Sequence, residues 1–280
     1  MPNLNFAALS ADLPLVLTVH DLSFEHYPSF FTAKERLWHH LVDPRTLVRR
    51  AAHLIAVSCH TKDDLISHYG IPNERVSVIY PGVADHFFQK PSFSEIQEVR
   101  DQYQLPSYFI LSLASPGSPR KNIQTLIEAF LHLRKNPNFS HLHLALAGKK
   151  PPSLPLPPNI HFLGYVPAAH RSILYRLATV FVYPSFYEGF GLPPLEAMAC
   201  GTPVVASHTA SLGEVIGNAG LLINPYHIND LIGALEQILT DETLAKASSE
   251  RGRERAAAFR WDRAARETLE LFKKVYAHRH

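Results

Sequence analysis

Short apolar runs alternate with longer amphipathic stretches along the chain. The apolar runs are rich in β-branched residues, and several lack polar alternation, as strands covered on both faces do. Strands that alternate with helices in this way are typical of βα units stacked into parallel sheets. The sequence therefore predicts an α/β protein with strands at 15–19, 54–57, 76–79, 109–113, 142–146, 160–162, 180–183, 203–206 and 221–223.

The amphipathic stretches between these runs predict the helices. Pro44 predicts a break in the first of them, because proline removes a helical hydrogen bond. Two further helices are expected at the C-terminus. The other expected ranges are 32–52, 61–69, 94–103, 122–135, 168–178, 193–200 and 229–239.

Composition narrows the class of protein. The 280 residues are 46% apolar, which excludes global disorder and allows one large domain or two modest ones. The 27 basic and 25 acidic residues leave a net charge of +2, too small for a general nucleic-acid binder. No run approaches the length of a membrane span, and residues 1–6 lack the basic start of a signal peptide, so we expect a cytoplasmic protein. Cys59 and Cys200 are expected to be reduced thiols in or near the core.

The expected domain boundary is the turn pair Pro81-Gly82, which ends a strand. Residues 1–82 then supply about three strands, fewer than the roughly four to six of an independent sheet, so this lobe is expected to be incomplete. Residues 83–262 are expected to form a doubly wound unit, and residues 263–280 a helix; the family resemblance described below implies that this helix packs back toward the first lobe. The proline-rich run 151–158 is expected to be a stiff loop.

The most informative stretch, 183–205, is predicted to form a strand, a glycine loop, a helix, a tight turn and a strand. Gly189 and Gly191 let backbone amides approach an anion, and a helix starting near Pro193 points its positive end into the same space. Such a nest lies where open α/β sheets bind ligands. Its free donors are the amides of Gly189, Phe190, Gly191 and Leu192.

Two carboxylates flank this nest, Glu188 before it and Glu196 in the first turn of the predicted helix. An acid beside a phosphate site is unfavourable unless it binds something else, and sugar hydroxyls are natural donors. The pair therefore favours a sugar phosphate or nucleotide sugar as ligand. The alternatives are that Glu196 complements the helix N-terminus and that Glu188 is a solvated loop residue.

The stretch from Glu188 to Glu196 resembles the E-x7-E motif of retaining GT-B glycosyltransferases, in particular glycosyltransferase family 4. Four further segments resemble this family in the same order: the His-Asp segment, the interdomain crossover, the basic segment and a glycine turn, at 17–24, 76–83, 119–122 and 162–166. The resemblance implies a GT-B fold with a Rossmann-like C-terminal donor domain and an incomplete Rossmann-like N-terminal domain.

The resemblance also implies roles for individual residues. Glu188 would bind hydroxyls of the donor sugar, and Glu196 those of the nucleotide ribose. Lys121, with Arg120, would neutralise the diphosphate, so that neither a metal nor a cofactor is needed. His20 would contact the transferred sugar. The implied catalytic residues are His20, Lys121 and Glu188, and the implied donor-binding residues are Arg120, Lys121, Gly164, Gly189, Phe190, Gly191, Leu192 and Glu196.

The bland alternatives for single residues stay open. Lys121 alone is also typical of a solvated helix start, and a single histidine among 17 is more often structural than catalytic. A dinucleotide-dependent oxidoreductase is disfavoured, because no GxGxxG follows the first strand.

The resemblance implies transfer of a hexose from a nucleotide sugar to a saccharide or lipid-linked acceptor in polysaccharide biosynthesis. The His-Asp-Leu-Ser-Phe segment favours a mannosyltransferase that uses GDP-mannose, with a UDP-sugar as the alternative. The chain starts past the midpoint of the family's first domain, and Ser115 and Pro116 replace a glycine and its neighbour. The competing hypothesis is therefore a catalytically incomplete nucleotide-sugar-binding lobe, either truncated or dependent on a partner.

Two basic clusters allow other interpretations. Three arginines at 45, 49 and 50, with Leu37, Trp38 and Leu41, are expected either to pack in the core or to form a surface that contacts the inner face of a membrane. The arginines at 251, 253 and 255 are expected to be a solvated helical face. The exposed edge of the first lobe predicts a partner or self-association.

Overall fold

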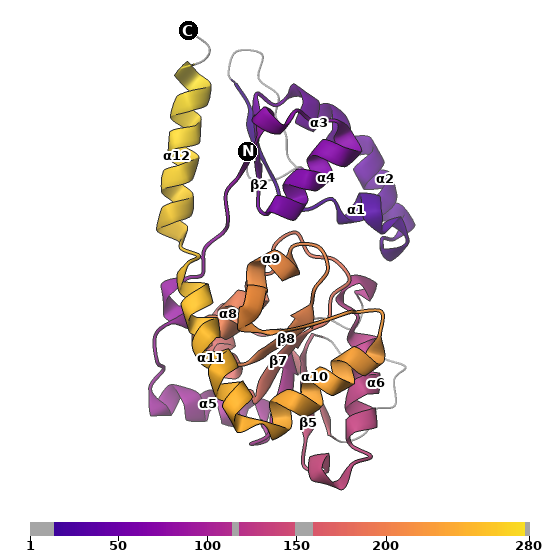
Figure 1. Ribbon diagram of the computed structural model, residues 1–280, viewed down its shortest axis with the longest axis vertical. Coiled ribbons are helices and arrows are strands. Elements are labelled where there is room, and N and C mark those ends of the chain that lie inside the picture. The colour runs from indigo at the N-terminus through magenta and orange to yellow at the C-terminus, as the bar shows by residue number, and fades with distance from the viewer. Residues whose placement is uncertain (1–13, 114–117, 149–158, 278–280) are drawn as a thin grey trace. The chain divides into compact units, whose positions relative to one another are not determined.

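The computed structural model describes residues 14–113, 118–148 and 159–277, which form two compact units (Figure 1). The first unit contains the described residues up to Gly82, the segment Glu188–Phe190 and the residues from Phe259 onward. The second contains the described residues of Val83–Tyr187 and Gly191–Ala258. The predictions on residues 115, 116 and 151–158 lie outside the described residues.

The described strands form two sheets in which neighbouring strands are all parallel, so the predicted α/β class is confirmed. The first unit has a sheet of order β1-β2-β3 and the second a sheet of order β6-β5-β4-β7-β8-β9. Each predicted strand is present within two residues of its expected ends. The bounds are β1 Val16–Val19, β2 His53–Ala56, β3 Val76–Val78, β4 Phe109–Ser112, β5 His143–Ala147, β6 Ile160–Gly164, β7 Val180–Tyr183, β8 Val204–Ser207 and β9 Leu221–Ile223.

The predicted helices are also present, and local sequence explains several of their ends. The break at Pro44 separates α2 from α3, where Asp43 has a left-handed φ of 46° and its carboxylate accepts a hydrogen bond from the Thr46 amide at 3.3 Å. The bounds are α1 Ser23–His26, α2 Ala33–Val42, α3 Pro44–Arg50, α4 Cys59–Tyr69, α5 Phe93–Tyr103, α6 Ile123–Leu133, α7 Ala168–Leu177, α8 Leu192–Cys200, α9 Leu212–Ile216, α10 Ile228–Thr240, α11 Glu242–Ala257 and α12 Trp261–Ala277. In the described part of the chain, no helix combines the length and the apolarity that a membrane crossing requires.

The first sheet is covered on both faces by different parts of the chain. On one face, Leu17 and Leu54 pack against Leu65 of α4 and its neighbours. On the other face, Val16 and Ile55 pack with apolar residues of α12, the last helix. Figure 1 shows α12 on one side of β2 and α3 with α4 on the other. The last helix therefore completes the core of the first unit.

The second sheet reverses its strand order between β4 and β7. From β4 the chain adds β5 and β6 on one side, and β7, β8 and β9 extend the sheet on the other. One face is covered by α6 and α10, whose apolar residues share a core with these strands. In open parallel sheets the carboxyl ends of the strands at such a switch point are the usual ligand site.

Two expectations about the surface are wrong. Leu37, Trp38 and Leu41 are exposed by 58%, 48% and 69%, so they do not pack in the core. Cys59, the first residue of α4, is exposed and therefore lies outside the core, whereas Cys200 is buried as expected.

Arg251 and Arg253 of α11 are exposed, as expected for a solvated helical face, whereas Arg255 is half-buried. The Nε atom of Arg255 donates to the Val215 carbonyl at 2.9 Å, and that of Arg251 donates to the Asn218 carbonyl at 3.1 Å. These side chains bind carbonyl groups at and after the C-terminal end of α9, where helical partners are lacking.

Candidate functional site

A basic turn is bound to the loop after β7 at the switch point of the second sheet. The turn is the 3₁₀ helix Pro119–Lys121, which follows β4. The Phe186 amide donates to the Arg120 carbonyl at 2.9 Å, and the Arg120 guanidinium donates to the Tyr187 carbonyl at 3.4 Å. The structure thus places two segments from different strands side by side at the edge where ligands are expected.

Lys121 reaches the end of β7 from this turn. Its ammonium group donates to the Tyr183 hydroxyl at 2.5 Å and lies 4.8 Å from the centre of the Tyr183 ring. Tyr183 is buried and is the last residue of β7. This contact fixes the lysine at the carboxyl end of the strand that leads into the glycine loop.

The loop after β7 enters α8 through Gly191. This residue has a φ of 109°, in the region that favours glycine, and a Cβ there would lie 2.6 Å from a methyl carbon of Leu212. The helix begins at Leu192, and Pro193 lacks an amide hydrogen, so the amides of Gly191 and Leu192 remain for a ligand at this helix end.

Glu196 does not lie in the first turn of α8, as the sequence suggested, because the helix starts one residue earlier. Its buried carboxylate accepts hydrogen bonds from the Tyr175 hydroxyl at 2.9 Å and from the Arg171 guanidinium at 3.3 and 3.4 Å. Both partners lie on α7, four residues apart, and so share a helix face. The alternative in which Glu196 complements the helix N-terminus is therefore wrong.

Burial sets the acid–base properties of this cluster. Loss of hydration raises the pKa of Glu196 above its ordinary 4.5, while the nearby Arg171 charge and the Tyr175 hydrogen bond oppose that rise. Burial and the neighbouring carboxylate raise the pKa of Tyr175 well above 10, so its hydroxyl remains a donor. A carboxylate has about four acceptor positions, so capacity remains for hydroxyl donors of a ligand.

A row of packed aromatic rings links Glu196 to Lys121. The Tyr175 ring packs edge-on against Phe181, with centroids 5.1 Å apart, and the Phe181 and Tyr183 rings stack at 5.9 Å. Phe181 and Tyr183 are two residues apart and therefore share a face of the strand. Glu196 and Lys121 are thus both anchored, through Tyr175 and Tyr183, to one face of β7.

Sequence analysis did not identify Arg171, Tyr175 or Tyr183 as members of this cluster. The available signal was their type and spacing, an arginine and a tyrosine at i and i+4 on a helix and a tyrosine ending a buried strand. Gly164, another predicted donor-binding residue, ends β6 with a φ of 67° and has open space where a side chain would begin.

The remaining predicted residues belong to the first unit. A Cβ on Gly189 would lie within 2 Å of the His20 carbonyl oxygen, so only glycine fits against this segment. The Thr61 hydroxyl donates to the carbonyls of His20 and Gly189, at 3.4 and 3.3 Å. Glu188, which precedes Gly189 in the sequence, is buried. The His20 side chain is exposed.

Phe190 anchors the end of this segment. It is buried and packs against Tyr80 and Phe259, with ring centroids 5.9 and 5.7 Å apart. The structure therefore gathers the predicted residues in two groups. One holds His20, Glu188, Gly189 and Phe190, and the other holds Arg120, Lys121, Gly164, Gly191, Leu192 and Glu196.

Two family profiles match the chain. Glycosyl transferases group 1 matches residues 96–255, more than half of the chain, and Glycosyltransferase Family 4 matches residues 2–87.

Curated relatives include mannosyltransferases. The O-antigen chain mannosyltransferase B of Escherichia coli is 31% identical over 92% of this chain and 70% of its own length. The MMP α-(1→4)-mannosyltransferase of Mycolicibacterium hassiacum is 30% identical over 94% of this chain and 66% of its own. The chain spans only 29% of the length of the serotype-specific mannosyltransferase WbdA of Escherichia coli, to which it is 34% identical.

Solved structures resemble the fold. The sucrose-phosphate synthase of Thermosynechococcus elongatus superposes with a TM-score of 0.76 at 27% identity, covering 94% of this chain and 68% of that one. The Anabaena protein HepE in complex with UDP-glucose superposes with a TM-score of 0.75 at 24% identity, covering 93% of this chain and 72% of that one.

Proposed function

Because the chain belongs to the glycosyl transferases group 1 and has the GT-B fold of family 4 glycosyltransferases, we propose that it transfers a mannose-type hexose from a nucleoside-diphosphate sugar, with retention of configuration. GDP-mannose is the favoured donor, since several relatives of this chain are mannosyltransferases. A UDP-sugar is the alternative donor. The acceptor is a saccharide or a lipid-linked saccharide.

The observation that carries this proposal is the position of Lys121. A fixed ammonium group at the end of β7, the strand whose following loop leads to the amides at the start of α8, suits the diphosphate of an activated sugar. In the proposed reaction Lys121 and Arg120 stabilise the charge that develops on the leaving diphosphate, so that no metal is required. The bond from the anomeric carbon to the phosphate oxygen breaks, the acceptor oxygen forms the new bond on the same face, and the proton of the acceptor hydroxyl passes to the leaving diphosphate.

The other predicted residues orient the donor in this proposal. Glu196 accepts hydrogen bonds from the ribose hydroxyls. Arg171 and Tyr175 hold its carboxylate in one orientation for this contact. Glu188 accepts hydrogen bonds from hydroxyls of the sugar, with the Gly189 to Leu192 amides on the diphosphate. His20 contacts the transferred sugar.

Thermal denaturation with a panel of nucleotides and nucleotide sugars tests the donor site. GDP or GDP-mannose is expected to raise the melting temperature of the full chain by mass action. The Lys121→Ala variant is expected to bind the diphosphate about 10- to 100-fold more weakly, because a charge-assisted hydrogen bond contributes about 1.5–3 kcal/mol. Lys135→Ala, an exposed lysine of the same unit, is the matched control. Equal nucleotide affinity in both variants would exclude Lys121 from the donor site.

A catalytically incomplete lobe is the second candidate function, supported by a first sheet of three described strands. Donor hydrolysis or transfer separates the two candidates. Turnover of GDP-mannose with a panel of saccharide acceptors supports the enzyme, whereas tight nucleotide binding without turnover supports the lobe.

Peripheral contact with an anionic membrane surface is part of this proposal. Leu37, Trp38 and Leu41 are exposed on α2, which precedes the basic helix α3. Exposed apolar side chains near arginines suit an interfacial helix. Co-sedimentation with anionic vesicles tests this, and a Trp38→Ser and Leu41→Ser double variant that sediments equally well would argue against it.

A further inference from the structure

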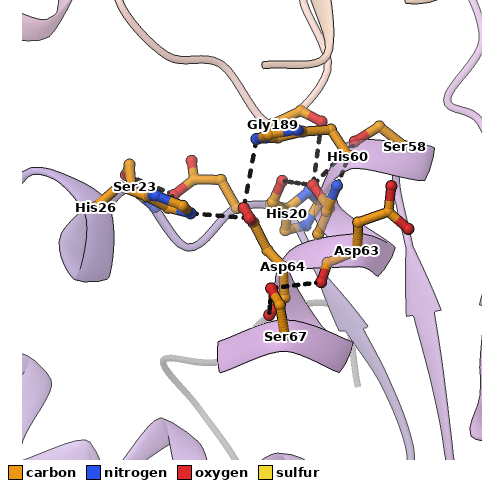
Figure 2. A network of polar contacts seen from close by, with 11 residues as sticks. His20, Ser23, His26, Ser58, His60, Asp63, Asp64, Ser67 and Gly189 are labelled. Carbon is orange, nitrogen blue, oxygen red and sulfur yellow. Dashed lines mark hydrogen bonds and ion pairs between the residues drawn. The ribbon is translucent and has the colours of Figure 1, made fainter. Parts of the chain in front are cut away.

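Two histidines and a buried aspartate of the first unit converge on one point, outside the residues proposed to bind the donor. His60 and Asp64 are four residues apart on α4 and therefore share a helix face, and His26 ends the short helix α1. Figure 2 shows the side chains of His26 and His60 pointing to the two sides of the Asp64 carboxylate. We propose that His26, His60 and Asp64 form a binding site for a divalent transition-metal ion, Zn²⁺ by preference.

The distances suit such an ion. The His26 Nε2 atom lies 2.9 Å from one carboxylate oxygen of Asp64, and the His60 Nε2 atom lies 3.5 Å from the other. One ligand atom from each of the three residues lies within 4.8 Å of the others. Ligands about 2.0–2.2 Å from a tetrahedral Zn²⁺ are about 3.3–3.5 Å apart, so small side-chain rotations bring all three into its coordination sphere.

The donor set selects the metal. Two imidazole nitrogens and one carboxylate suit Zn²⁺, Co²⁺ or Ni²⁺, whereas Mg²⁺ and Ca²⁺ prefer all-oxygen ligands. Both Nε2 atoms are shielded from solvent, and the Asp64 side chain is 7% exposed. A dication bound at this point places positive charge beside the buried Asp64 carboxylate, where the low-dielectric surroundings strengthen the attraction.

The bound ion would hold α1 against α4. Asp21, the residue after His20, accepts hydrogen bonds from the amide and hydroxyl of Ser23, at 2.9 and 2.6 Å. These bonds fix the start of α1 at Ser23. The His20 carbonyl in turn accepts a hydrogen bond from Thr61, the residue after His60. The metal would therefore stabilise the segment around His20, which is bonded to α1 through Asp21 and to α4 through Thr61.

Zinc titration of the metal-free full chain, followed by competition with a chromogenic chelator, tests the proposal. We expect one tightly held equivalent, together with a rise in melting temperature that Zn²⁺ produces and Mg²⁺ does not. Co²⁺ in its place is expected to give the visible absorption bands of a low-coordinate site. His60→Gln and Asp64→Asn are each expected to lower the affinity for zinc by at least about 10-fold. That is the smallest usual effect of losing a residue that only hydrogen-bonds to a metal ligand.

Because the chain has 17 histidines, a matched control is essential. His40→Gln, on the exposed surface of α2, should retain the tight equivalent. His26→Gln changes a residue of the short α1, and circular dichroism verifies that each variant is folded. Absence of tight zinc binding by the parent chain, or equal affinity in the parent and these ligand variants, would overturn the proposal.

Discussion

Glu196 shows how one buried carboxylate can be both costly and useful. Removal from water raises its pKa, and two donors on α7 offset part of that cost. The same donors restrict the carboxylate to one orientation. At the scale of the residue, rigidity of this acid is therefore obtained from side chains that need not touch a ligand.

Tyr175→Phe removes the shorter of these hydrogen bonds and leaves the carboxylate buried. We expect the free energy of unfolding to fall by about 1–3 kcal/mol, the usual cost of an unsatisfied buried group. Urea denaturation measures this. Tyr103→Phe is the control, because its hydroxyl bonds the His170 ring at a partly exposed site and its loss should cost less than about 1 kcal/mol. Equal losses in the two variants would contradict the importance of the buried bond.

The raised pKa of Glu196 predicts a pH dependence. The folded chain holds the Glu196 proton more tightly than the unfolded chain, so this group contributes most stability below pH 4.5. That contribution is lost as the pH rises from 4.5 through the folded pKa and is constant above it. Comparing the parent with Glu196→Gln by urea denaturation from pH 4 to 8 isolates the effect, because other groups titrate in both. A difference in stability that does not change with pH would contradict it.

At the scale of elements, sequence pattern was sufficient for the strands and most helices but not for their contacts. Buried strands carry their own β-branched signal, and Pro44 marks its own helix break. The start of α8 was misplaced by one residue, which moved Glu196 into the first turn, because a glycine with left-handed φ precedes two prolines. The partners of Glu196 lie on α7, and the spacing within α8 contains no information about that neighbour.

The prediction of a solvated side chain was wrong for Arg255 of α11, for the same reason. A run of alternating charges is typical of a solvated helix, yet Arg255 donates to the backbone carbonyls of Glu214 and Val215 on α9. Five residues are too few to stabilise a helix alone, so α9 depends on such external partners.

Arg255→Ala is expected to lower the free energy of unfolding by about 1–2 kcal/mol, because two carbonyl groups lose their donor. Arg266→Ala is the control, since this arginine pairs with Asp262 on an exposed helix face and should change stability by less than about 0.5 kcal/mol. Urea denaturation of both variants measures the difference. A neutral Arg255→Ala variant would show that the contacts to α9 do not stabilise the chain.

At the scale of the whole molecule, neither unit is a single stretch of chain. The first unit combines its opening strands with Glu188–Phe190 and with the last helix, α12. Sequence analysis could expect a final helix beside the first lobe from family resemblance, but it could not identify Leu271 as the buried contact. Which residues of α12 are buried depends on which face of the helix meets the sheet. Exposed apolar residues such as Leu269 make that face hard to identify from the sequence pattern.

Leu271→Ala tests whether α12 stabilises the first unit. Leu271 packs with Val16 and Ile55, so we expect a loss of about 2–3 kcal/mol, near the lower end for buried leucines because the cluster is small. Leu269→Ala, on the same helix but 53% exposed, should change stability by less than about 0.5 kcal/mol. Thermal denaturation and protease sensitivity of the first unit report the effect. Equal melting curves for the two variants would contradict a structural role for α12.

The composition of the first unit also orders events during synthesis. Strands β1, β2 and β3 leave the ribosome before the second unit, but α12, the helix that covers one face of their sheet, leaves after it. Residues 83–258 supply all the elements of the other sheet and are complete before α12 emerges. These strands therefore wait, with an apolar face uncovered, while the whole second unit is translated, and a chaperone that covers this face would act during that interval.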